Sequence, residues 1–115
     1  MVQNRNKLIN VFIGNLTNSI VHAILEKAVK KDKDYLADKY RKELITSFEI
    51  AKIYRDKINP KNIPLPEKDI SFIEEKIVKR VKAELRIRIS KGYQGLNLDE
   101  VDKEVSEALK KTNIS

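Results

Sequence analysis

The residues of this chain best suited to chemistry lie near its N-terminus. They are polar and recur three or four residues apart, with a carboxylate one turn beyond: Asn15, Asn18, Ser19, His22 and Glu26. On a helix this spacing places them on one face. There His22 could act as a general base, or the cluster could hold a small polar ligand.

No catalytic triad or metal site can be completed around this cluster. No Ser, Cys or carboxylate pattern accompanies His22 as a triad would require, and one His with one Glu makes a poor metal site. We therefore predict that the protein is not an enzyme and has no cofactor or metal. Instead, the amides and the imidazole are expected to form hydrogen bonds across a helix–helix interface, where a few polar groups set the register.

A second set of candidates is basic. Between Lys79 and Lys91 the chain carries six cations against Glu84 alone. Such a face could follow a phosphate backbone. The predicted phosphate-binding or partner-binding residues are Lys79, Lys82, Arg86, Arg88 and Lys91. A solvated charged face explains the pattern equally well, because Glu75 shares it and no aromatic residue accompanies the cations for base stacking.

Arg88 differs from the other cations because it falls near the centre of an apolar stripe. Glu84 lies one turn before it, so an ion pair at the rim of the core is expected. The alternative is that Arg88 anchors an anion or a partner, since its planar guanidinium suits a carboxylate or phosphate. Tyr93 and Gln94 would then belong to the same site.

The first helix, predicted over about residues 5–31, must position the polar cluster. It contains Leu8 to Leu25, eighteen consecutive residues without a formal charge. One of its faces is continuously apolar, while the other mixes polar and apolar residues. This mixture predicts a helix covered on both sides, the second side by another chain or by a late segment of the same chain. The predicted interface residues are Val11, Gly14, Asn15, Asn18, Val21, His22 and Leu25, and the glycine would let a second backbone approach closely.

Three further helices are predicted from apolar residues spaced three or four apart, over about 34–58, 67–91 and 98–112. A crossover containing prolines, residues 59–66, separates the second from the third. Residues 85–89 alternate like a strand, but the run is short and has no second strand to pair with, so it is assigned to the third helix. Gly92 is expected to end that helix, and Asn97 to begin the last. The fold class is therefore all-α, a four-helix bundle-like single domain over residues 1–115 with three long helices and a short C-terminal one.

Composition limits the class of protein further. The 115 residues carry a formal charge of +7 and no cysteine, which indicates a basic protein of a reducing compartment. The apolar run holds six polar residues, so we expect no membrane span and a cytoplasmic location. Abundant Lys and Glu without Cys is also compatible with a thermophilic source.

From these features we predict a non-catalytic interaction or scaffold protein that self-associates, as a homodimer, through its N-terminal helix. One alternative is a nucleic-acid-associated protein that uses the basic end of the third helix, and another is a small polar-ligand pocket around His22. An unidentified protein partner is a further possibility.

Overall fold

The computed structural model describes residues 5–29, 34–59 and 65–112, and within these ranges it contains helices and no strand. The elements are α1 (Arg5–Val29), α2 (Asp34–Ile58), α3 (Glu67–Ser90), a 3-10 turn η1 (Leu98–Glu100) and α4 (Val101–Lys111). The all-α, bundle-like prediction is confirmed. The predicted end of the first helix beyond Val29 and most of the crossover, residues 60–64, lie outside the described residues.

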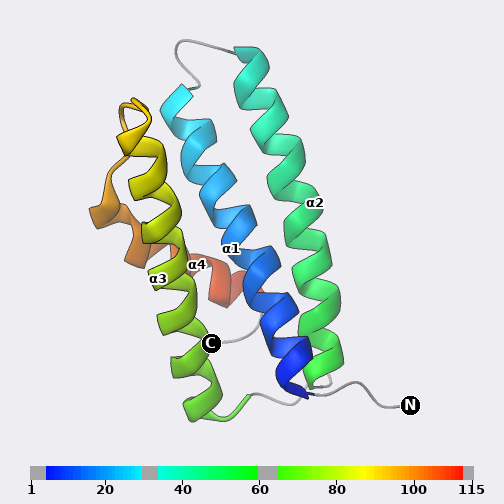
Figure 1. The fold of residues 1–115 in the computed structure, drawn as a ribbon. Helices are drawn as coiled ribbons and strands as arrows, with labels where there is room; N and C mark the ends of the chain where they lie inside the picture. Colours follow the sequence, from blue (N-terminus) through cyan, green and yellow to red (C-terminus); the bar gives the residue numbers. More distant parts are fainter. Residues whose placement is uncertain (1–4, 30–33, 60–64, 113–115) are drawn as a thin grey trace.

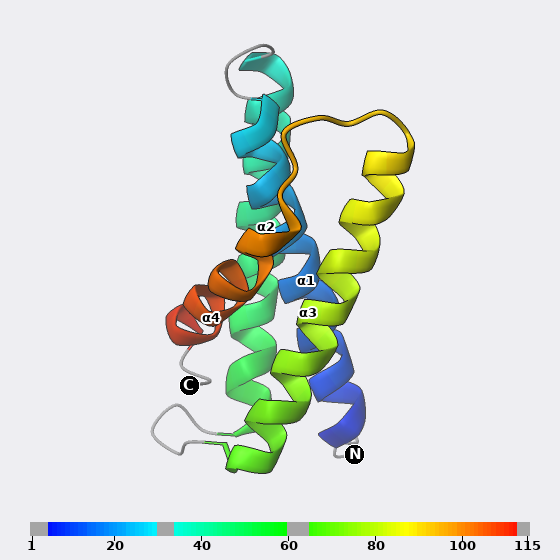
Figure 2. The ribbon, with the colours of Figure 1, turned by 90° about the vertical axis from the view of Figure 1, so that its left-hand side faces the viewer.

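The three long helices lie side by side with α1 in the middle (Figure 1). α2 runs antiparallel to α1, as the short connection predicts, while α3 runs in the same direction as α1. α4 crosses the long helices instead of lying along them (Figure 2). The result is an elongated molecule of 46 × 24 × 23 Å in which α1 touches every other helix.

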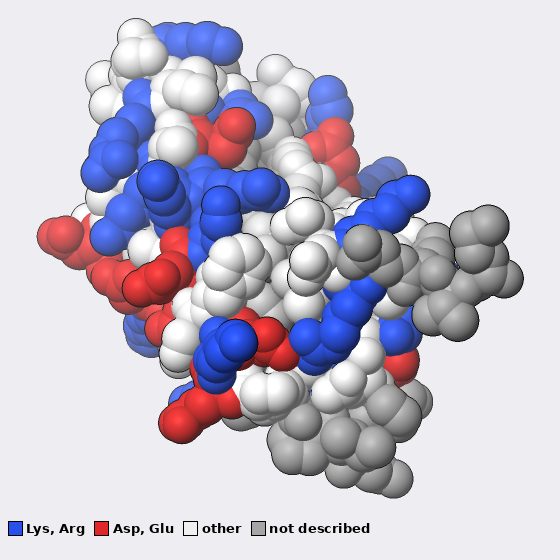
Figure 3. Space-filling model, turned by 60° about the horizontal axis from the view of Figure 1, so that its bottom comes forward, with Lys and Arg blue, Asp and Glu red and all other residues white. Residues whose placement is uncertain are grey.

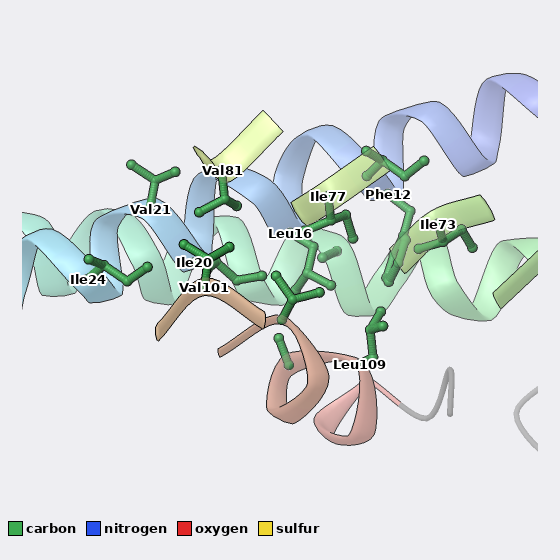
Figure 4. Packing of buried hydrophobic residues seen from close by; sticks show 14 of the residues in the cluster. Phe12, Leu16, Ile20, Val21, Ile24, Ile73, Ile77, Val81, Val101 and Leu109 are labelled. Atoms are coloured by element: carbon green, nitrogen blue, oxygen red, sulfur yellow. The ribbon is translucent and has the colours of Figure 1, made fainter. Parts of the chain in front are cut away.

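The core is built on α1. Phe12, Ile13, Leu16 and Leu25 have no exposed surface. The predicted stripe of α3 faces them, and its residues Ile73, Ile77, Val81 and Leu85 are also fully buried. From α4, Val101 lies beside Ile20 and Leu109 points toward Phe12 (Figure 4). Burial of this apolar surface is the main driving force for the fold.

The end of α3 is closed by glycine, as predicted. Residues 85–89 are helical, and Gly92 follows with φ +99°, a conformation that other residues rarely adopt. Tyr93 N–H donates to the Arg88 carbonyl at 3.1 Å, the bond that closes a glycine-capped helix end. This turn folds the chain back and places the Tyr93 ring beside Arg88. Asn97 then begins η1, its side-chain oxygen accepting from Asp99 N–H at 2.9 Å.

Candidate functional site

A groove of about 310 Å³ runs between α1 and α3 and is the candidate functional site. α1 contributes Gly14, Thr17, Asn18 and Val21, and α3 contributes Arg80, Ala83, Glu84 and Arg88. The groove opens on the side of α1 away from α4, since the hollow between α1 and α4 is lined by the opposite helix positions Ser19, Ile20 and Ala23. Small side chains at Gly14 and Ala83 leave it open.

Two polar atoms in this lining are buried and lack a hydrogen-bond partner among the described residues: Thr17 Oγ1 and Arg88 Nε. Thr17 is 7% exposed, so its hydroxyl is shielded from bulk water. A buried polar group without a partner costs about 1–3 kcal/mol. Such groups therefore mark a place where a bound molecule could supply the missing partner.

The charges of the groove alternate along α3. Arg80, Glu84 and Arg88 are spaced four residues apart and all line it. The predicted ion pair between Glu84 and Arg88 is absent, because no carboxylate in the described part of the chain lies within 4.0 Å of Arg88. The Arg88 guanidinium instead lies over the Tyr93 ring, 5.6 Å from the ring centroid. This is a cation–π contact, in which the ring attracts the positive charge. Tyr93 thus contacts a groove residue without lining the groove itself.

Tyr93 connects the groove to the interior. Its hydroxyl shares a hydrogen bond of 3.1 Å with the Tyr40 hydroxyl. Burial, together with this hydrogen bond, raises the pKa of Tyr40 to about 12. Tyr40 also lies against His22, with ring centroids 5.6 Å apart. The loop that carries Tyr93 is therefore anchored to α2 through Tyr40.

The polar cluster predicted around His22 faces α2. His22 Nδ1 donates to the Asn18 carbonyl at 2.7 Å, and Nε2 lies 2.6 Å from the Glu43 carboxylate. Asn18 donates to the Ser47 hydroxyl at 2.6 Å, and Ser19 donates to the Leu44 carbonyl. These are hydrogen bonds across a helix–helix interface, but the partner is α2 of the same chain. Both ring nitrogens of His22 are occupied, and His22 does not line the groove.

The predicted interface residues of α1 divide into two groups. Val21, His22 and Leu25 are 3%, 9% and 0% exposed, buried by the chain itself. Gly14 and Asn18 are exposed, and Val11 and Asn15 are half-buried, with Asn15 donating to the Val11 carbonyl. The second face of α1 is thus covered by its own chain in its C-terminal half and open only in its middle.

The predicted phosphate-binding cations do not form one set either. Lys79, Arg86 and Lys91 are exposed, whereas Lys82 lies 3.8 Å from Asp102 of α4 and Arg88 faces the groove. Lys79 borders a different hollow, lined also by Glu74, Glu75 and Asp102. Figure 3 shows Lys and Arg side chains gathered on the side of the molecule where α3 lies, with Asp and Glu side chains next to them.

Two further features of the chain bear on the site. No group of three or more His, Cys, Asp or Glu that could hold a metal ion occurs among the described residues. By length and composition α1 could cross a membrane, with a hydropathy of 1.5 over its most apolar window, yet 67% of that window is buried inside the protein. The core helix of a soluble protein passes the same test.

Sequence reasoning missed Thr17 as a groove residue. It occupies an otherwise apolar position beside Leu16 and Ile20, and a hydroxyl on an apolar stripe was the available signal. Arg88 gave the same kind of signal on α3 and was recognised. Comparison with protein-family models, with curated proteins and with solved structures finds no match to this chain, so its function is argued from its own geometry.

Proposed function

We propose that the protein is a non-catalytic interaction protein that self-associates through the α1 strip, defined as the exposed residues Asn10, Gly14 and Asn18. Of the interface residues predicted from the sequence, only Gly14 and Asn18 are exposed. Asn10, one turn before Gly14, was not among them and extends the strip. It lies between α2 and α3 on the open side of α1. Its residues are uncharged in a protein in which 36% of residues are charged.

Gly14 carries the proposal. A methyl group added at Gly14 would have no atom within 4 Å apart from the local helix, so the chain itself makes no use of the space that this glycine leaves. Glycine in the middle of a helix costs about 1 kcal/mol relative to alanine. Close packing of a second helix backbone at Gly14 would offset this cost.

The spacing of the strip suits two copies related by a two-fold axis. Asn10 and Asn18 lie four residues before and four after Gly14. If two α1 helices cross in antiparallel directions at Gly14, Asn10 of each copy lies opposite Asn18 of the other. Each amide can both donate and accept, so the two pairs satisfy one another, as an isologous interface requires.

The surroundings of the strip also favour a docked partner. A hollow of about 470 Å³ flanks its N-terminal end, lined by residues that include Asn10 and Phe72. Phe72 is 46% exposed, which is high for a large aromatic side chain. A helix seated on the strip would cover this ring as well.

The oligomeric state tests the proposal directly. Light scattering over a micromolar range of concentration should show a dimer of the unchanged chain. Gly14→Leu should give a monomer, because the added side chain keeps the second backbone away. Thr46→Leu is the control, since it places the same leucine side chain at an exposed position on α2, away from the strip. It should leave the dimer intact.

Two outcomes would contradict self-association through the strip. One is an unchanged chain that scatters as a monomer throughout the range. The other is a dimer that Gly14→Leu does not weaken, while the circular dichroism of the variant remains helical.

A second candidate function is binding of a nucleic-acid backbone, favoured by the exposed cations on α3 (Figure 3). Lys79, Arg86 and Lys91 would carry it, because Lys82 is close to Asp102. Binding to a random duplex should weaken steeply as salt rises. Replacement of Lys79, Arg86 and Lys91 by Glu should abolish it. A complex that tolerates this triple replacement would exclude the basic face.

We also propose that the chain works as a soluble protein of the cytoplasm. The absence of cysteine suits a reducing compartment, and most of the apolar window of α1 is packed against the chain's own helices. Cell fractionation after expression should place the protein in the supernatant. Recovery in a membrane pellet that resists an alkaline wash would contradict this proposal.

A further inference from the structure

The α1–α3 groove contains binding groups that self-association does not use. Thr17 Oγ1 and Arg88 Nε are both hydrogen-bond donors, both are buried, and neither has a partner among the described residues. Thr17 is more than nine-tenths buried and lines the groove. A helical threonine normally donates its hydroxyl to a carbonyl of the preceding turn, as Thr46 of α2 does to Lys42. Two unused donors therefore line the same groove.

Two donors, one of them on a guanidinium, match the oxygens of a carboxylate. Arg presents its N–H groups in a planar fork that fits a carboxylate in two parallel hydrogen bonds. The Tyr93 ring supports the Arg88 guanidinium at 5.6 Å and so limits the positions that it can take. A carboxylate bound in the groove would supply the acceptor that these donors lack.

Glu84 favours a ligand that carries a positive charge as well as a carboxylate. It lines the same groove, one helical turn from Arg88 and one from Arg80, about 6 Å along the helix axis in each direction. No cation in the described part of the chain forms an ion pair with it. A carboxylate side chain repels a multiply charged phosphate but accepts hydrogen bonds from an ammonium group.

We propose that the α1–α3 groove binds a small zwitterion, a free α-amino acid, with its carboxylate on Arg88 and Thr17 and its ammonium on Glu84. The volume of about 310 Å³ matches the lower end of pockets for small ligands. Arg80 lies on the far side of Glu84 and places a second positive charge there. Acidic amino acids, which carry a second carboxylate, are therefore expected to bind best.

This site overlaps the surface proposed for self-association. Gly14 and Asn18 belong to both the groove and the α1 strip, so a docked second copy would cover the mouth of the groove. Asn10 belongs to the strip alone. The variant Asn10→Arg should therefore prevent association without touching the groove, which allows ligand binding to be measured on a monomer.

The test is titration of isotope-labelled Asn10→Arg protein, observed by amide chemical shifts. Glutamate, glycine, acetate and inorganic phosphate are the probes. Glutamate should give saturable shifts at Thr17 and around Arg88, with glycine weaker. Acetate and phosphate should bind least, because acetate has no group for Glu84 and phosphate is repelled by it.

Three variants separate the contacts. Arg88→Lys keeps the charge but loses the fork and should weaken glutamate binding about tenfold, the effect of one charged hydrogen bond. Thr17→Val keeps the volume without the hydroxyl and should weaken it severalfold. Glu84→Gln should weaken glutamate binding but should not weaken acetate binding, because acetate has no ammonium group for Glu84 and the repulsion between the two carboxylates is removed. Arg86→Lys, at an exposed position outside the groove lining, is the control and should change nothing.

Three results would overturn the proposal. The first is the absence of saturable shifts with any amino acid, and the second is phosphate binding at least as tightly as glutamate. The third is shifts confined to residues outside the groove. None of these results alters the light-scattering test of the α1 strip, so the two proposals can fail separately.

Discussion

The C-terminal half and the middle of α1 carry similar residues but differ in what covers them. In the C-terminal half, α2 holds His22 through Glu43, and Leu25 is completely buried. In the middle, Gly14 is exposed and faces open space. The loop after α3 explains part of the difference, because it brings Tyr93 onto Tyr40 near the C-terminal half. One face of this uncharged run is therefore covered by the chain in the C-terminal half of α1 and exposed in its middle.

The difference shows what an uncharged helix can mean. Apolar and amide residues around the whole circumference require cover, but the cover can come from different sources along the length. Here the chain supplies it for Val21 and Leu25, and leaves the α1 strip and the groove to other molecules. A variant in each region should therefore affect different properties.

The largest effect is expected from the closed half. Leu25→Ala should lower the free energy of unfolding by about 2–5 kcal/mol, because it leaves a cavity in a fully buried site. Asn10→Ala, in the open region, should change it by no more than about 0.5 kcal/mol. Urea unfolding of both variants measures the contrast. Similar losses at Leu25 and Asn10 would show that the two regions do not differ in cover.

The closed half should also respond to alkaline pH. The pKa of Tyr40 rises from 10.0 in the unfolded chain to about 12 in the fold, so the folded state holds its proton more tightly. The resulting stabilisation is complete below about pH 10 and is lost as pH rises to about 12. Two pKa units correspond to about 2–3 kcal/mol. Tyr40→Phe has no proton to lose and should show a smaller decrease over this range.

Urea unfolding of both proteins at several alkaline pH values measures this effect. All other ionisable groups are common to both proteins, so their effects cancel in the difference between them. Equal losses of stability in Tyr40→Phe and the unchanged chain would mean that the Tyr40–Tyr93 contact does not contribute.

Two glycine substitutions compare an exposed helix position with a turn position whose backbone conformation requires glycine. Gly14→Ala in dilute protein should raise the free energy of unfolding by about 1 kcal/mol, because the new methyl group meets nothing and the helix gains propensity. Gly92→Ala should lower it by about 1–2 kcal/mol, since φ is +99° there. Thermal unfolding at low concentration measures both. A destabilising Gly14→Ala would show that the space at Gly14 is already used.

The helices were predictable because each depends on local pattern. The stripe Ile73, Ile77, Val81 and Leu85 follows from spacing alone, and Gly92 and Asn97 have the roles that their residue types predict. Residues 85–89 are helical despite their strand-like alternation, as predicted, because the helical spacing of apolar residues continues through them.

The cover of α1 and the geometry of the groove were not predictable in the same way. A helical wheel shows that Val21 and Leu25 need burial, but not that the same chain provides it. Arg88 pairs with Tyr93 and not with Glu84, because the turn after Gly92 brings the ring to it. Arg55 is only 2% exposed although its spacing gave no sign of burial, and it donates to the Asn59 carbonyl at the end of α2. Such contacts depend on how a loop turns, which residue types limit but do not determine.

The smallest expected effect concerns how α4 is attached to the closed half. Lys27 Nζ donates to Glu104 at 2.7 Å, and this hydrogen bond raises the pKa of Lys27 above its usual 10.5. The pair therefore contributes below about pH 10.5 and is lost above it. Because the Lys27 side chain is 65% exposed, solvent screens most of the attraction. A double-mutant cycle with Lys27→Met and Glu104→Gln should give a coupling of a few tenths of a kcal/mol that falls as salt rises. A coupling above about 1 kcal/mol that is insensitive to salt would show that charge, and not burial of Val101 and Leu109, holds α4 on α1.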